Sequence, residues 1–157
     1  MGSTDNRVQG TNISNPSLTE ESASVQSHLQ LMQGVIQRMA VNSSSCKAWC
    51  ITIVSAILVL IADKNRPELA WLALFPSFLF LALDVYYLAL EKAFRMSYNE
   101  FIKKLHEKQL YSVDLYLIAP KGNISIHQLE SIKSFSVWGF YGALMFLVVL
   151  AKELVLE

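Results

Sequence analysis

Three long apolar stretches, separated by polar segments, dominate the pattern of this 157-residue chain. They run over residues 46–62, 69–90 and 135–151. As helices they measure about 26, 33 and 26 Å, close to the roughly 30 Å thickness of a bilayer core. Buried helices of soluble proteins are usually shorter and keep one polar face. The pattern therefore predicts an all-α integral membrane protein with three transmembrane helices.

The first two stretches are joined by residues 63–67. A link this short allows only a tight turn, so residues 46–90 are expected to form an antiparallel transmembrane hairpin (46–62 and 69–90). Pro76 lies inside the second stretch, where we expect it to kink the helix.

The polar region before the hairpin divides into two parts. Residues 1–16 are rich in Gly, Ser, Asn and Thr, which is typical of a disordered tail, and residues 1–42 lack the pattern of a cleavable signal peptide. Residues 17–45 are predicted to form a cytoplasmic amphipathic helix that opens with a capping box of Ser17 and Glu20. Its apolar positions recur every three or four residues, at Val25, Leu29, Met32, Ile36 and Met39. This seam packs either on the same chain or between subunits.

Residues 91–134 are expected to form a cytoplasmic segment. Its apolar residues continue the helical period of the second span through Leu110, and residues 112–118 then form an irregular connection. After a turn at 120–123, Ser125 and Gln128 have the spacing of a second capping box. This box is predicted to open the helix that becomes the third span, so that residues 135–157 hold the third transmembrane helix and the C-terminus.

Charge sets the expected orientation. The chain has 13 Lys+Arg and 13 Asp+Glu, 17% charged residues and a mean hydropathy of +0.35, so it lacks the basic surplus of nucleic-acid-binding proteins. Basic residues concentrate on the side of the N-terminus and of residues 91–134, which predicts that this side is cytoplasmic. That side holds Arg38, Lys47, Lys92, Arg95, Lys103, Lys104, Lys108, Lys121 and Lys133, and the other holds Lys64, Arg66 and Lys152.

One acidic residue, Asp84, lies inside an apolar stretch, where an unpaired charge is costly. In a hairpin centred on Asn65, residues at equal depth have numbers that sum to about 130, which brings position 84 level with position 46 or 47. Position 47 is Lys. We therefore predict an intramembrane Asp84–Lys47 ion pair, which is either structural or part of an ion or proton path.

Other residues of the spans are expected to position the helices. Trp49, Tyr86 and Tyr87 fit an interfacial aromatic belt on the cytoplasmic side, and Trp71 fits one on the outer side. Gly139 and Gly142 in the third span allow close approach of another helix.

Candidate chemistry is sparse. Cys46 and Cys50 share a helix face, but a metal site needs about four ligands and no His lies near them in sequence, so we interpret them as packed, reduced thiols and expect no metal or cofactor. Lys103, Lys104 and Lys108 form either a solvated helix face or a contact with anionic head groups. No phosphate loop, nucleophile elbow or HExxH motif is present, so we expect no enzymatic activity.

Two segments resemble a known family. Residues 29–62 contain Arg38-Met39-Ala40, Asn42-Ser43, Lys47 and Trp49, and residues 81–98 contain Leu83-Asp84, Tyr86-Tyr87, Glu91, Phe94 and Arg95. This pattern resembles the RipA-type small bacterial inner-membrane proteins. The resemblance covers about half of the chain and implies a helical membrane protein that assembles into a ring-like homo-oligomer of eight subunits without known catalysis. A looser likeness is to small membrane effectors of anti-phage loci.

Three functions are compatible with these features. The first is a non-enzymatic bacterial inner-membrane protein that forms a homo-oligomeric ring with a scaffold, envelope-stress or virulence-related role. The second is a membrane-disrupting effector or channel that is gated through its cytoplasmic segment. The third is an accessory subunit of a transporter or enzyme. The expected partners are the lipid bilayer, further copies of the chain and an unidentified cytoplasmic partner, with no nucleic acid.

Overall fold

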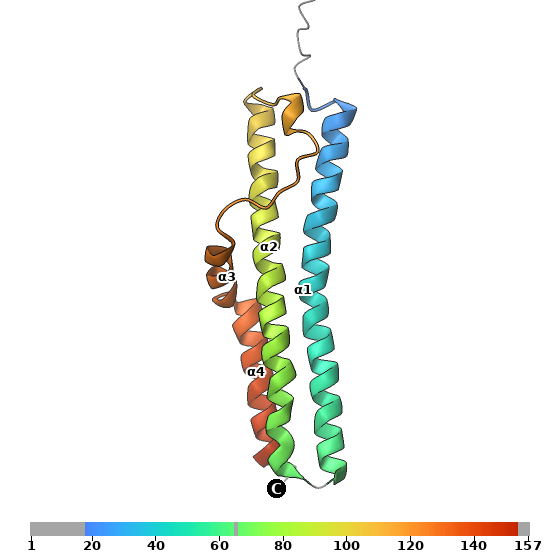
Figure 1. Cartoon of the computed structure of the whole chain (residues 1–157), viewed down its shortest axis with the longest axis vertical. Helices are drawn as coiled ribbons and strands as arrows, with labels where there is room; N and C mark the ends of the chain where they lie inside the picture. The colour runs from blue at the N-terminus through green and yellow to red at the C-terminus, as the bar shows by residue number, and fades with distance from the viewer. Residues whose placement is uncertain (1–17, 65, 154–157) are drawn as a thin grey trace, which may run out of the picture.

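The computed structural model describes residues 18–64 and 66–153, which form helices and connecting loops without any strand (Figure 1). The predicted all-α architecture is confirmed for these residues. The predicted tail at 1–16, the cap at Ser17 and the last four residues lie outside them. The elements are α1 (Ala23–Lys64), the 3-10 helix η1 (Pro67–Ala73), α2 (Leu74–His106), the 3-10 helix η2 (Ser112–Asp114), α3 (Ile124–Ile132) and α4 (Phe135–Ala151).

The long helices α1 and α2 lie antiparallel and side by side along their full length, as Figure 1 shows. The helix α4 packs on the half of α2 near the turn, and α3 lies beside the middle of α2. Residues 23–42 of α1 and 91–106 of α2 extend beyond α4, and we call this two-helix part the stalk. Residues 107–123, which run back along the stalk to α3, are called the strap.

The helix α1 continues without a break through residues 45 and 46, where the first span was predicted to begin, as one helix of 42 residues. Residues 42–45 are Asn-Ser-Ser-Ser, which form helices weakly. Ser43 is nevertheless buried and bonded to α2, so tertiary contacts keep the helix intact here. The helix begins at Ala23, several residues later than the expected start at Ser17.

The structure places Pro76 near the start of α2, whereas the expected kink assumed that it lies within a continuous helix. The second apolar stretch starts as η1 and becomes α-helical only at Leu74, so Pro76 is the third residue of α2. The amide groups of a first helical turn have no intrahelical partner, so the missing N–H of proline costs little there. The Ser77 hydroxyl donates to the carbonyl of Ala73, 3.0 Å away, at the change from η1 to α2.

The helical period of α2 continues beyond residue 90 as predicted, but α2 ends at His106 instead of Leu110. Lys108 adopts a left-handed conformation with φ of 55°. The amides of Lys108 and Gln109 bond back to the carbonyls of Leu105 and Lys104, at 3.1 and 2.9 Å. This arrangement is a Schellman motif, which ends the helix and sends the strap back along it.

The segment that precedes the third apolar stretch does not continue into it as one helix, which corrects another expectation. The side chain of Asn123, not of Ser125, accepts the capping hydrogen bond, from the Ser125 amide at 3.0 Å. The helix α3 then ends at Ile132, and α4 follows after a bend of 51°. Asn123 has extended backbone angles, which a capping residue needs, whereas Ser125 already lies inside the helix.

Two helices, α1 and the segment Glu68–His106, are long and apolar enough to cross a membrane, and the bent pair α3 and α4 makes a third if it acts as one span. Because α1 is about 63 Å long and a bilayer core roughly 30 Å thick, about half of it extends beyond a membrane that it crosses. The buried residues match this division. One cluster joins Cys50, Val54, Ala73, Val85, Val137, Tyr141 and Val148. Another, in the stalk and the strap, joins Val25, Met32, Phe101, Leu105 and Leu110.

Candidate functional site

Asp84 is the centre of the candidate site. Its side chain is 0% exposed, and Lys47 Nζ lies 2.6 Å from its Oδ2. Ser43 Oγ donates to Oδ1 at 2.5 Å. The structure therefore brings together the two residues that were expected to pair and adds a hydroxyl from the preceding turn of α1. With one oxygen facing a cation and the other accepting a hydrogen bond, the carboxylate is well compensated.

The register of the hairpin explains this contact. Ser43 and Lys47 are four residues apart, so they lie one above the other on the same face of α1. Sequence reasoning missed Ser43, although its spacing from Lys47 is a usable signal. Cys46 and Cys50 continue this face, and both are free, buried thiols.

Tyr141 brings α4 to the site, and the sequence did not reveal this. Its side chain is fully buried, close enough to Asp84 to interact electrostatically. Residues from α1, α2 and α4 thus meet around one carboxylate, which fits a role in fixing the relative position of the three helices.

Among residues 18–64 and 66–153, no group of three or more His, Cys, Asp or Glu is arranged to hold a metal ion. The carboxylate is already neutralised by Lys47. The arrangement can hold charge in an apolar environment, and it can pass a proton only if the ion pair opens.

The seam predicted in the first helix faces α2 of the same chain. Val25 and Met32 are buried in the stalk core, where Leu29 packs against them. Ile36 and Met39 are half-buried. The structure thus places the seam as in the first of its two interpretations. The buried positions also include His28, which the pattern of apolar residues did not indicate.

The aromatic and glycine positions lie mostly on the surface. Trp49, Trp71 and Tyr86 are exposed and Tyr87 is half-buried, as belt residues would be, although the belt itself stays a prediction. The structure does not bring Gly139 and Gly142 to a contact between helices of this chain. A Cβ at Gly139 would meet only Phe135 of the same helix, and one at Gly142 would meet nothing.

The basic cluster near the end of α2 is engaged within the chain. Lys104 Nζ lies 2.8 Å from Asp114 of the strap, and Lys103 Nζ lies 3.8 Å from Glu107. The hydrogen bond between Lys104 and Asp114 raises the pKa of Lys104 and lowers the pKa of Asp114, so both stay charged over the physiological range. This pairing weakens the case for a head-group site there.

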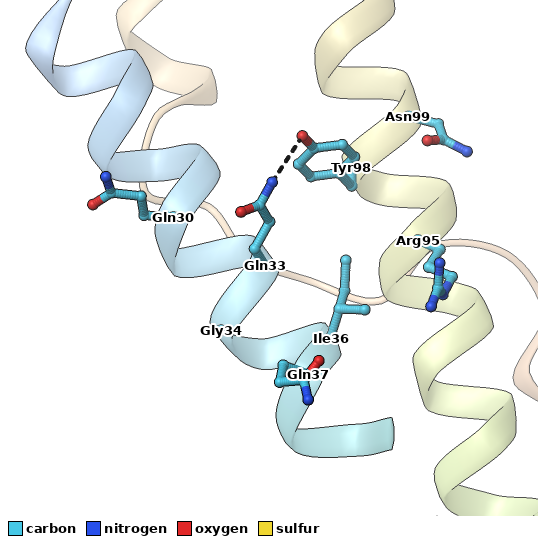
Figure 2. A pocket seen from close by; sticks show the side chains of 8 residues that line it. All are labelled: Gln30, Gln33, Gly34, Ile36, Gln37, Arg95, Tyr98 and Asn99. Carbon is cyan, nitrogen blue, oxygen red and sulfur yellow. Dashed lines mark hydrogen bonds between the residues drawn. The ribbon is translucent and has the colours of Figure 1, made fainter. Parts of the chain in front are cut away.

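A groove of about 710 Å³ lies along the stalk between α1 and α2 (Figure 2). The amide of Gln33 crosses it and donates to the hydroxyl of Tyr98 at 3.2 Å. Its lining is mainly uncharged and polar, and consists of Gln30, Gln33, Gly34, Ile36, Gln37, Arg95, Tyr98 and Asn99. A second groove of about 470 Å³ lies between α1 and α4 and is almost entirely apolar.

A comparison of the chain with protein-family models, curated proteins and solved structures finds no match.

Proposed function

We propose that this chain is a non-enzymatic integral membrane protein whose copies assemble through the outer face of α1, as a homo-oligomer of the bacterial inner membrane. The supporting observation is a continuous exposed face along α1. Its residues recur at helical spacing from the stalk into the apolar half and are all exposed: Gln30, Gly34, Gln37, Val41, Ser44, Ala48, Thr52, Ser55 and Val59.

This face is unusual for one that meets only lipid. Ser44, Thr52 and Ser55 place hydroxyls on this face, whereas neighbouring exposed residues of α1 such as Ile51 and Ile53 are large and apolar. Small and hydroxyl-bearing residues at membrane depth favour contact with another helix, because they allow close approach and hydrogen bonding across it.

The two grooves lie on the same side of α1. Gln37 lines the stalk groove and Ser55 lines the groove beside α4. They are 18 residues apart, which is about five full helical turns at 3.6 residues per turn. A helix of a neighbouring copy could therefore follow one side of α1 through both grooves, and the ring of eight subunits implied by the family resemblance is one such assembly.

Measuring the mass of the full chain in mild detergent tests the proposal. We expect a multiple of 17.7 kDa for the wild type, and a shift towards the monomer for Ser55→Trp, which puts a bulky side chain on the proposed face. Ile53→Trp is the matched control, since Ile53 is exposed at nearly the same depth on the opposite side of α1. A monomeric wild type, or equal loss of assembly in both variants, contradicts the proposal.

A channel or membrane-disrupting effector is the second candidate. The observation that favours it is the same set of hydroxyls, which a ring of copies would repeat around its axis. Ion flux through liposomes that contain the purified oligomer, reduced by Ser55→Leu with assembly intact, would support this function over a scaffold. The absence of ion flux through these liposomes favours the scaffold.

A further inference from the structure

Two ion pairs attach the strap to α2. Asp114 pairs with Lys104 at 2.8 Å, and Lys121 pairs with Glu100. Near the second pair, Ser97 Oγ donates to the carbonyl of Ala119 at 2.7 Å. These contacts attach the strap to α2 alone, so they do not by themselves hold α1.

Leu110, Leu115 and Ile118 of the strap belong to the apolar cluster that holds Val25 and Met32 of α1. Beside this cluster, a buried histidine makes the hydrogen bond between the strap and α1. His28 is 1% exposed, and its ring packs against Phe101 with the ring centroids 4.4 Å apart. Its Nδ1 accepts a hydrogen bond from the backbone amide of Tyr116, 2.9 Å away. In this arrangement the three parts of the stalk region, α1, α2 and the strap, meet at one imidazole.

This hydrogen bond exists only when the ring is neutral. An imidazole whose Nδ1 accepts a hydrogen bond carries its proton on Nε2, and protonation turns Nδ1 into a second donor. Two N–H groups would then face each other at a buried position, and the Tyr116 amide would lose its acceptor. Protonation of His28 therefore opposes the closed strap directly.

The backbone of the strap is strained where it meets His28. Tyr116 has φ of 64°, in the left-handed region that is unfavourable for a residue with a side chain. Such conformations persist only where the surrounding contacts impose them. Loss of the His28 hydrogen bond removes one of these contacts and lets Tyr116 relax.

The charged groups around His28 belong to two elements. Glu100 and Lys104 come from α2, and Asp114 and Lys121 come from the strap. They form the two ion pairs described above, so their charges balance. Hydrogen bonds to the lysines lower the pKa of both Glu100 and Asp114, so these carboxylates stay ionised at pH values where a histidine titrates.

We propose that His28 is a pH-sensitive latch: the neutral ring holds the strap on α1, and the protonated ring releases it. Burial lowers the pKa of His28 below its ordinary value of 6.5, and Asp114 opposes this in part. The neutral ring therefore contributes its full stabilisation of the strap on α1 above pH 6.5, and this stabilisation is lost as the pH falls through the lowered pKa of His28. The latch needs no assembly and goes beyond the proposed function.

Hydrogen exchange of the full chain in detergent, followed by mass spectrometry and corrected for the intrinsic pH dependence of exchange, tests the latch. We expect the protection of strap residues 111–119 to fall at least tenfold from pH 7.5 to pH 5, while the protection of α2 stays constant. Pairing with carboxylates does not titrate away in this range, so it cannot produce the same change.

Two variants separate the latch from general destabilisation. His28→Asn keeps an acceptor oxygen near the place of Nδ1 and cannot be protonated there, so its strap should stay protected at both pH values. His106→Gln removes an exposed histidine and should retain the wild-type response. A wild-type strap whose protection does not change with pH overturns the proposal, as does a full pH response in His28→Asn.

Discussion

Lys47 and Asp84 differ in how deeply their side chains are buried. The lysine side chain is 19% exposed and reaches the surface, whereas the aspartate is 0% exposed. A long lysine can turn its ammonium group outward when its partner is lost. The aspartate cannot do so, and its charge would stay buried with only Ser43 to compensate it.

The two charges should therefore respond differently to removal. We expect Lys47→Met to lose about 3–5 kcal/mol of stability, since it leaves a buried charge unpaired, and Asp84→Asn to lose clearly less. The double variant should recover much of the loss of Lys47→Met. Thermal unfolding in detergent, followed by circular dichroism, measures these differences.

The loss of stability in the two single variants distinguishes a structural ion pair from one that belongs to an ion or proton path. If both variants melt like the wild type, the pair does not hold the helices together, and a role in ion or proton movement becomes the better explanation. Mass measurement of the same variants shows whether assembly changes with stability.

At the scale of elements, the start of α3 depends on one side chain. Asn123 Oδ1 accepts from the Ser125 amide at 3.0 Å, whereas Ser125 lies inside the helix as its second residue. Asn123→Ala should cost about 1 kcal/mol, and Ser125→Ala should change stability by only a few tenths. Hydrogen exchange of the α3 amides measures both. Equal losses of stability in the two variants would instead support the capping box of Ser125 and Gln128 that the sequence predicts.

The elements also show what could be predicted from the sequence. The apolar stretches, the tight hairpin and the register of Asp84 with Lys47 follow from periodicity and length, which are local properties of the chain. The continuity of α1 through residues 42–45 does not follow from them, because it depends on contacts with α2. The late start of α2, which places Pro76 in its first turn, likewise depends on the packing of η1.

The candidate site was predictable only in part for the same reason. Asp84 is conspicuous because a charge interrupts an apolar stretch. Tyr141 is not, since an aromatic residue among apolar neighbours gives no sign of the helix it will face. His28 shares a face with Val25 and Met32, but nothing in the spacing shows that a strap 88 residues later donates an amide to it.

At the scale of the whole molecule, the stalk and strap lie at one end and the turn between α1 and α2 at the other (Figure 1). The distribution of Lys and Arg predicts that the strap is cytoplasmic and the turn external. With native thiols that are buried, single added cysteines can report on this. In spheroplasts, an impermeant maleimide should label Asp63→Cys at once and Ser112→Cys only after lysis. Labelling in the reverse order contradicts the orientation, and the unmodified chain controls for reaction at Cys46 and Cys50.

The uninterrupted course of α1 has a mechanical consequence. A single α-helix resists twisting, so its two halves turn as one rigid body. His28 and Lys47 lie on this helix about five turns apart at 3.6 residues per turn. Any rotation of α1 about its axis would therefore carry His28 and Lys47 together and shift Lys47 and Ser43 relative to Asp84 of α2.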